Sequence, residues 1–304
     1  MKKIHSAAFY YLLLFSVILL WGLDPTVYSF LYRYYSASVL CAVCTFVSFL
    51  FFLLICAKRL NQLNTHYIKT AVPISAINAV AGLLQRIGLQ YTTPAKYAFL
   101  EHLSCAVVPA ALFLLAKKRP SRLQLFACLL CLTGCFILSG AGTELRVTTG
   151  DLLCTLSGIL YGVGIAAIGI YAVKLDGTLY MTVYMLVYFL LSVLSCILLN
   201  QTKVGGLPLE TAVFTANVGI LAGAALFGLT SVGITWLLRT EAIKHLNPTT
   251  VGILSPLTAI IAGTVSVIAG TDPLTWNLAA GALLIAAAAA LCAVADTGKQ
   301  RRKR

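Results

Sequence analysis

The sequence predicts an all-α integral membrane protein of ten transmembrane helices, arranged as two inverted five-helix repeats. Three observations support this prediction: a very apolar composition, ten apolar segments of membrane-spanning length, and a weak likeness between the two halves of the chain. Of the 304 residues, 60% are hydrophobic and 10% are charged, whereas soluble domains carry about 25% charged residues. So few charges cannot cover a water-soluble fold of this length, which excludes a disordered chain, a nucleic-acid-binding domain and a secreted disulfide scaffold.

The number of spans follows from helix geometry. A helix needs about 20 apolar residues to cross a hydrocarbon core about 30 Å thick, because each residue rises about 1.5 Å. A helix also satisfies its own backbone hydrogen bonds, as a segment in lipid must. We expect the spans at residues 8–30, 37–57, 70–90, 94–116, 123–141, 151–172, 179–199, 213–237, 248–269 and 274–295.

Short polar breaks justify the boundaries between these spans. Lys2 and Lys3 precede an apolar run that is longer than the core of a signal peptide, so we interpret that run as a retained first helix. Lys58-Arg59 follows the second span, and Thr92-Thr93-Pro94 separates the third span from the fourth. Lys117-Lys118-Arg119 follows the fourth span. The connections are short, so any function must reside in the helix bundle itself.

The basic residues indicate the orientation in the membrane. With ten spans both termini face the same side, and placing them inside puts 17 of the 22 Lys and Arg residues on that side. Positive residues favour the cytoplasmic face, so we expect both termini in the cytoplasm and the protein in the cell membrane, plasma or inner. The basic tail from Lys299 to Arg304 acts as a cytoplasmic topology signal, or it lies against anionic headgroups.

The two halves of the chain share short motifs in the same order. Thr93-Pro94 and Asn247-Pro248 open corresponding helices, the fourth and the ninth. Leu20-Trp21-Gly22 near the start of the first half resembles Leu160-Tyr161-Gly162 in the second. Five spans per copy is an odd number, so the second copy must enter the membrane upside down. Such inverted repeats are typical of secondary transporters, in which the two copies flank a site near the membrane midplane.

These motifs also carry a family resemblance. The run Leu20 to Pro25 resembles the tryptophan–glycine start of EamA-type transporters of the drug/metabolite transporter superfamily. The stretch Gln90 to Leu100, followed by Val108-Pro109, is similar to that family's fourth helix. Leu246-Asn247-Pro248 and Ile253 to Leu257 resemble its ninth helix. Short as the motifs are, their order covers essentially the whole chain.

The resemblance implies a ten-helix inverted-repeat fold, with repeats at 1–145 and 146–304 and a basic tail ending the second. It also implies transport, often export, of small metabolites such as amino acids, sugars or nucleosides. Three departures stand out: Cys44 takes the place of a frequent arginine, Ala259 that of a second proline, and the usual acidic residue is Asp272. The first departure removes any role borrowed from that arginine.

Charged residues within the spans are the strongest candidates for function, because burying a charge in lipid is costly. Asp24, Arg86 and Glu101 lie on the first, third and fourth spans, and we expect all three in the outer half of the membrane, sharing one polar cavity. His102 points about 100° away from Glu101 on the same helix. Alternatively, Arg86 pairs with Glu101 or Asp24 only so that its charge is tolerated inside the bundle. A further alternative is that Asp24 marks the end of a shorter first span, at the level of the headgroups.

Helical spacing adds further candidate residues for substrate binding or coupling. Polar and aromatic side chains recur on one face of each of three spans. These faces are Trp21, Asp24 and Tyr28; Asn78, Gly82 and Arg86; and Tyr97, Glu101 and Ser104. Tyr161 joins them from the sixth span, as the counterpart of Trp21. The aromatic rings could stack on a flat or cationic substrate, or serve packing and interfacial anchoring.

Two mechanisms remain open at this stage. A carboxylate held away from water can take up a proton and couple transport to a proton gradient. Alternatively, Arg86 neutralises a substrate carboxylate while Asp24 or Glu101 binds an amine. The expected partners are therefore a small-molecule substrate, membrane lipid and, in the first mechanism, protons. The substrate and the oligomeric state are left open.

Other chemistry finds little support in the sequence. Cys41-x-x-Cys44 and Cys128-x-x-Cys131 lie in apolar spans without a histidine partner, so we expect neither a metal nor a cofactor. No nucleophile–base motif is present, so we do not expect an enzyme. Two glycine pairs, Gly158-x-x-x-Gly162 and Gly219-x-x-x-Gly223, predict close helix contacts. The alternatives to a transporter are an integral-membrane enzyme, a non-transporting partner protein and a lipid flippase.

The charge bias generates a direct test of topology. Cysteine-free protein carrying one added cysteine at either end should react with a membrane-impermeant maleimide only from the cytoplasmic side. An added cysteine in the loop after Arg33 should react only from the outside. Opposite labelling of the two chain ends would contradict an even number of spans.

Overall fold

The computed structural model describes residues 7–92, 99–139, 147–204, 207–208, 210–270 and 274–301. Two expected residues, Tyr97 and Asp272, lie outside these ranges. The helices of the first half are α1 (Ala7–Leu31), α2 (Ala37–Cys56), the 3₁₀-helix η1 (Ala57–Gln62), α3 (Thr65–Leu89), α5 (Ser104–Ala116) and α6 (Arg122–Ser139). Those of the second half are α7 (Thr149–Tyr171), α8 (Gly177–Gln201), α9 (Val218–Phe227), the π-helix η3 (Gly228–Ile234), α10 (Thr235–His245), α11 (Pro248–Leu254), α12 (Leu257–Ile268) and α13 (Trp276–Arg301).

The all-α membrane fold is confirmed. Ten stretches of the described chain are helices long and apolar enough to cross a membrane. A two-residue hairpin, β1 (Lys203–Val204) with β2 (Leu207–Pro208), follows α8. One span differs clearly from its expected bounds: the eighth runs from Val218 to His245, not over 213–237.

Local sequence explains where several helices begin. The side chains of Asn64, Asp176, Asn217 and Asn247 each accept hydrogen bonds from backbone N–H groups in the first turn of the helix that follows. Thr148 begins α7 with a reciprocal capping box to Asp151. Because Asn217 caps α9, the eighth span starts later than its hydropathy indicates.

Three spans depart from regular α-helix. The fourth span is interrupted at His102-Leu103, where backbone bonds join residues three apart, and it resumes as α5. The ninth is interrupted at Ser255-Pro256 between α11 and α12. The two breaks fall at corresponding places in the sequence, about eight residues after Pro94 and Pro248. The eighth span contains the π-helical turn η3, and such turns occur frequently at functional sites.

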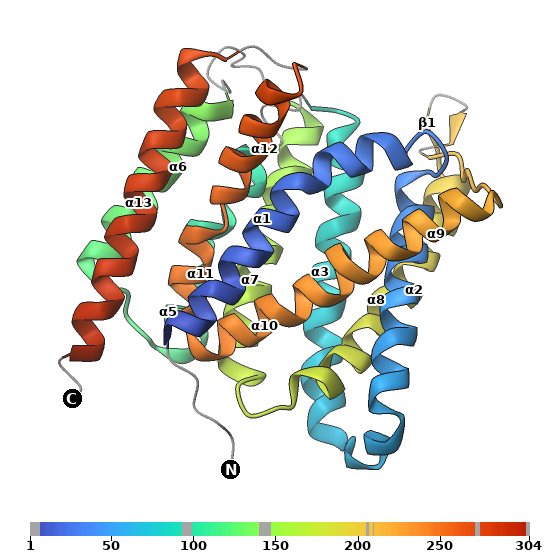
Figure 1. Cartoon of the computed structure of the whole chain (residues 1–304), viewed down its shortest axis with the longest axis horizontal. Coiled ribbons are helices and arrows are strands. Elements are labelled where there is room, and N and C mark those ends of the chain that lie inside the picture. The colour runs from blue at the N-terminus through green and yellow to red at the C-terminus, as the bar shows by residue number, and fades with distance from the viewer. Residues whose placement is uncertain are drawn as a thin grey trace.

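The helices pack in matched pairs. The first span, α1, lies against the eighth and ninth spans, while the sixth, α7, lies against the third and fourth. The second span packs on the seventh, and the fifth packs on the tenth. Each contact in the first half therefore has a counterpart in the second: the first span contacts the eighth and ninth as the sixth contacts the third and fourth. The pairs formed by the second with the seventh span and by the fifth with the tenth are their own counterparts. In Figure 1, α1 begins and α13 ends at the lower end of the bundle, and α1 runs alongside the α9–α10 segment, which it contacts.

Glycines make the closest of these contacts possible. A Cβ added at Gly22 of α1 would lie 2.6 Å from Ile261 Cβ on α12, and one added at Gly162 of α7 would lie 2.6 Å from Val107 Cβ on α5. Gly158 packs directly on the backbone of Leu100. The close contact predicted for the Gly158–Gly162 pair is therefore confirmed.

The corresponding prediction for Gly219 and Gly223 is wrong. A Cβ at Gly223 would have nothing within 4 Å, and one at Gly219 would touch only the nearby Asn217 side chain. The reason is the face of the helix: Gly219 and Gly223 point away from the bundle. The next residue, Ala224, is buried, and its carbonyl accepts a hydrogen bond from Cys44 Sγ of α2.

A polar cluster closes the lower end of the bundle. Asp176 caps α8 through Thr178 and Leu179, and Arg59 binds its carboxylate at 2.8 Å. Although partial burial acts against it, hydrogen bonds from Thr178 and Arg59 hold the pKa of Asp176 down at about 2. Lys244 Nζ donates to Leu175 O at 2.8 Å and to Glu241 at 2.7 Å, so the end of α10 is tied to the same loop.

The Asp176 cap generates a stability prediction. Asp176→Ala should lower stability by about 1 kcal/mol, because the first backbone N–H groups of α8 lose their acceptor. Asp176→Asn should lower it less, since the amide oxygen still caps and the exposed ion pair contributes little. Thermal unfolding in detergent measures both.

The same experiment has a pH arm. The folded pKa of Asp176 lies below its ordinary value of 3.8, so its charge stabilises the fold above that value and stops doing so as the pH falls towards about 2. The difference between parent and Asp176→Asn should shrink over that window. Equal losses of stability in Asp176→Ala and Asp176→Asn at pH 7 would instead show that the Arg59–Asp176 ion pair, rather than the helix cap, provides the stabilisation.

Candidate functional site

Asp24 belongs to a hydrogen-bonded network between α1 and the π-helical turn. The Ser231 hydroxyl donates to the Asp24 carboxylate. Trp21 Nε1 donates to Ser231 O at 2.9 Å and to Thr235 Oγ1 at 3.1 Å. α1 continues seven residues beyond Asp24, to Leu31, so the helix itself does not end there. The network joins the first span to the irregular part of the eighth.

Arg239 is a buried cation within this region, although it lies just beyond the expected eighth span at 213–237. Only 8% of the residue is exposed. Its guanidinium carbon lies 5.0 Å from the ring centre of Trp21 and 5.6 Å from that of Trp236. Stacking on two indoles offsets part of the cost of burial. The expectation failed because polar residues after 237 indicated a loop, whereas α10 continues to His245.

A row of tyrosines on α8 extends the aromatic surface. Tyr180, Tyr184 and Tyr188 recur every four residues and are all buried. The ring of Trp236 lies 5.4 Å from that of Tyr184 and 6.0 Å from that of Tyr188. The sequence shows the four-residue spacing of these tyrosines, but the seventh span carries no charged residue, so charge alone does not mark it as part of a functional site.

The polar face of α3 points at this row, as its spacing predicts. Asn78 Nδ2 donates to the Tyr184 hydroxyl at 2.8 Å, and its buried Oδ1 has no hydrogen-bond partner. A Cβ added at Gly82 would lie 2.8 Å from the Tyr188 hydroxyl and 3.5 Å from Arg86 Nη1. Asn78, Gly82 and Arg86 therefore face the same interior region.

Arg86 lies near the upper end of α3. Its Nη2 donates to Ser195 Oγ of α8 at 3.3 Å, and its Nε is buried without a partner. Within the described residues no ion pair joins Arg86 to Asp24 or Glu101. Simple charge neutralisation by these carboxylates, one alternative from the sequence, is therefore not observed.

Glu101 precedes the break in the fourth span. It is half-buried and makes no hydrogen bond or ion pair within the described part of the chain. Tyr161 of α7 lies close enough to interact electrostatically with Glu101 and with Arg86, and its hydroxyl donates to Gln85 Oε1 at 3.3 Å. His102 interacts instead with the Cys131 thiol on α6, which agrees with the predicted divergence from Glu101.

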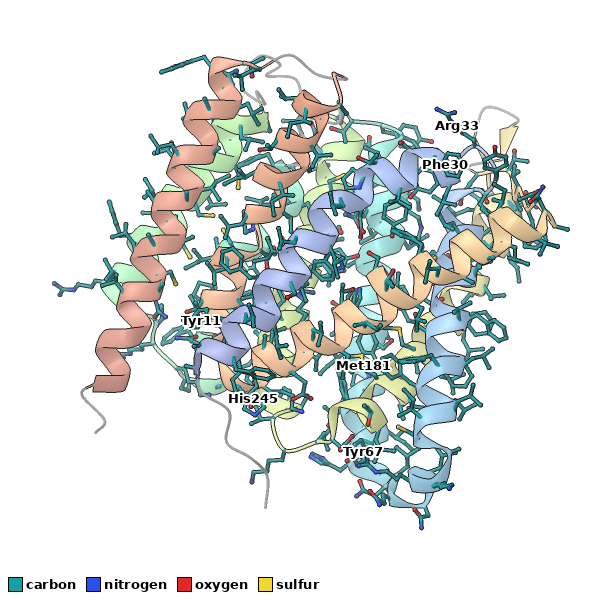
Figure 2. The ribbon with its side chains drawn as sticks, viewed as in Figure 1. Tyr11, Phe30, Arg33, Tyr67, Met181 and His245 are labelled. Atoms are coloured by element: carbon teal, nitrogen blue, oxygen red, sulfur yellow. The ribbon has the colours of Figure 1, made fainter. Side chains whose placement is uncertain are left out.

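Two cavities of about 330 and 400 Å³ are present among the described residues, and no candidate residue lines either. The first is bordered by α1, α12 and α13, the second by α5 and the start of α6. The candidate side chains instead pack on one another through the aromatic rings. In Figure 2, Tyr67 and His245 mark the lower end of the bundle and Phe30 and Arg33 the upper end.

The cysteines are reduced and dispersed. All ten carry free thiols, and among the described residues no group of three His, Cys, Asp or Glu side chains could hold a metal. Cys44 occupies the place where the family resemblance led us to look for an arginine. A larger side chain there would meet the backbone of Gly228, because α2 packs on η3 at this point.

Comparison with known proteins identifies the type of fold. A description of the EamA-like transporter family matches residues 8–140. The resemblance noted in the sequence is thereby confirmed over residues 8–140.

A solved crystal structure supports the fold over nearly the whole chain. It superposes with a TM-score of 0.76, covering 96% of this chain and 99% of the other, at 18% sequence identity. At that identity the likeness concerns the fold alone. No curated protein matches the sequence.

The Asp24 network generates a stability prediction. Ser231→Ala should cost about 1–3 kcal/mol, because it leaves a partly buried carboxylate without its donor. The neighbouring Thr230→Ala is the matched control, since its hydroxyl bonds only to its own helix, and it should change stability by less than about 0.5 kcal/mol. Chemical or thermal unfolding in detergent measures the stability of both variants. Equal stability losses in the two variants would show that the Ser231–Asp24 hydrogen bond does not stabilise the fold.

Proposed function

We propose that this protein is a secondary transporter that moves small polar or amphipathic metabolites, such as amino acids and related compounds, by alternating access. Export is the proposed direction, and the proposed location is the plasma or inner membrane with both termini in the cytoplasm. The EamA-like family supports transport itself. The substrate class, the direction and the mechanism rest on the arguments that follow.

The observation that carries the proposal is the interruption of two spans at corresponding places. The fourth span breaks at His102-Leu103 and the ninth at Ser255-Pro256. At both places the backbone keeps helical φ and ψ angles but tightens, with hydrogen bonds between residues three apart. A stretch of this 3₁₀ type inside a helix often marks a hinge, and transporters place irregular helices around the substrate, near the junction of their two repeats. Here the first break directly follows Glu101.

The matched packing of the spans supports the inverted repeat and rocking of one copy against the other. Trp21 of α1 donates to the eighth span, and its counterpart Tyr161 of α7 donates to the third. Gly22 and Gly162 make the same kind of contact with α12 and α5. Two copies with equivalent contacts can exchange roles, so that the interior opens first to one side and then to the other.

Glu101 is the proposed coupling residue. Ser231 holds the Asp24 carboxylate, whereas no partner within the described chain holds that of Glu101. A carboxylate without a fixed partner can take up a proton or bind a substrate amine at small structural cost. Its place beside the break in the fourth span links that event to the part of the helix best able to move.

The proposed sidedness agrees with the distribution of charge. The lower end carries Lys58, Arg59, Lys174 and Lys244 on or beside the loops that join the spans. The positive-inside rule makes this end cytoplasmic. Arg86 then lies towards the outer face, and Arg239 lies beside Trp21 in the middle part of α1.

The test is transport by purified protein in liposomes that enclose a pH-sensitive dye, challenged with pools of metabolites. Proton movement should appear only with a substrate, and it should disappear in Glu101→Gln while the variant still folds. Glu101→Asp keeps the carboxylate and should retain part of the proton flux. Substrate uptake that is indifferent to Glu101→Gln would remove this residue from the mechanism.

A further inference from the structure

We propose that the groove between α5 and the start of α6 holds one anionic phospholipid, with an acyl chain along α5 and the phosphate against Arg119. The site lies apart from Asp24, Arg86 and Glu101, and it goes beyond the proposed transport, on which it does not depend. Three features support it: an apolar groove with exposed walls, a basic cluster at its mouth without acidic partners, and the N-terminal end of α6 beside that cluster.

The groove has a volume of about 400 Å³. α5 forms its floor with side chains at the i, i+3, i+4 and i+7 positions of one helical face: Ala106, Pro109, Ala110 and Phe113. The two alanines keep the middle of this face low, and Leu125 of α6 forms the opposite wall. α6 packs mainly on α13 rather than on α5, which leaves space between the two helices where their connection begins.

The walls of the groove belong to the surface that meets lipid. Phe113 is 40% exposed and Leu125 is 46% exposed, and both lie within apolar, membrane-spanning helices. Acyl chains surround such helices, so an acyl chain is the apolar group that reaches the groove. A helix from a second copy of the chain would also match apolar walls, but it would leave the charges at the mouth unexplained.

The mouth of the groove is strongly basic. Four exposed basic residues occupy the α5–α6 connection and the first turn of α6: Lys117, Lys118, Arg119 and Arg122. Arg119 lines the groove itself. None of the four forms an ion pair within the described chain, and no acidic residue occurs in the sequence between Glu101 and Glu144. An anionic headgroup complements these charges.

The backbone of the connection brings the charges to the groove. Lys117 ends α5 in the left-handed conformation, with a φ of 54°, and its N–H donates to Phe113 O at 3.0 Å. The chain turns back at this point, and Arg119 comes to line the groove. Ser121 and Gln124 then cap α6 reciprocally. The positive end of the α6 helix dipole therefore lies beside the basic cluster.

The two halves of the site together select one class of lipid. Apolar helices contact every lipid, and basic loops attract every anionic headgroup. A phosphate bound by the guanidinium of Arg119, next to a seated acyl chain, satisfies both at once. Soluble phosphate has no chain to bury, and a zwitterionic headgroup brings a second positive charge to the cluster. An anionic phospholipid meets neither obstacle.

Quenching of tryptophan by brominated acyl chains locates the lipid. Phe113→Trp places an indole in the wall of the groove, whereas Phe126→Trp places one on an exposed part of α6 that does not line it. Both changes are made together with Trp276→Phe, because Trp276 is 83% exposed. The full chain is reconstituted in vesicles of dioleoyl phosphatidylcholine and dioleoyl phosphatidylglycerol, and each lipid is brominated in turn.

The indole in the groove should prefer phosphatidylglycerol to phosphatidylcholine at least about fivefold more strongly than the indole of Phe126→Trp does. A basic residue near the membrane surface contributes a factor of about five, so Arg119→Gln should bring the two preferences close to equality. Lys58→Gln is the matched control, since it removes an exposed lysine from η1 that lines neither cavity. It should leave the preference in the groove unchanged.

The apolar half of the site has its own test. Ala110→Phe fills the groove while every charge stays in place, and it should lower the preference at Phe113→Trp to that at Phe126→Trp. Leu114→Phe is the matched control, because Leu114 is 68% exposed and does not line the groove. A preference that persists in Ala110→Phe would mean that the headgroup alone is attracted, and it would contradict a seated chain.

Three further results overturn the proposal. Equal preferences at the two indoles of the parent, or equal losses in Arg119→Gln and Lys58→Gln, would show a diffuse attraction of anionic lipid to basic loops. Release of phosphatidylglycerol by millimolar glycerol 3-phosphate would show that a soluble anion suffices. Absence of quenching in the groove, with dimers cross-linked through Phe113→Cys, would give the groove to a second copy. The comparison of the two indoles decides even where Arg119→Gln fails to fold.

Discussion

The backbone in lipid must satisfy its own hydrogen bonds, and this constraint organises the whole protein. Regular helix meets it along most of the ten spans, and lipid-facing surface is apolar as a result. The described chain departs from regular helix within the membrane at three places: His102-Leu103, Ser255-Pro256 and the π-helical turn η3. Each lies where neighbouring helices pack closely, so other protein groups compensate.

The irregular backbone and the buried charges therefore occur together. Ser231 in the π-helical turn supplies both a hydroxyl to Asp24 and a carbonyl to Trp21. Glu101 directly precedes the break in the fourth span. A regular helix has no spare backbone acceptor to offer, so polar side chains in a bundle gather where the helix is interrupted. Asp24 and Glu101 follow this pattern, whereas Asn78, Arg86 and Tyr161 lie on the continuous helices α3 and α7.

Much of the architecture was accessible from the sequence, because it depends on local properties. Hydropathy and length predicted the ten spans, and capping residues such as Asp176 and Asn247 agree with where helices begin. The polar face of Asn78, Gly82 and Arg86 was also predicted, since helical spacing alone places these residues together. Residues distant in sequence were harder: nothing in α8 signals that Tyr184 will meet Asn78, or that Tyr188 will lie near Arg86.

Arg239 shows most clearly what the sequence determined and what only the tertiary structure decided. Sequence determined that the chain is a membrane protein of ten helices, because apolar content and helix length are sums over neighbouring residues. It could not determine that Arg239 is buried, since that depends on Trp21, more than 200 positions away, and on Trp236 meeting it across the bundle. A charge near the end of a span is exposed or buried according to what packs against it, and that packing exists only in three dimensions.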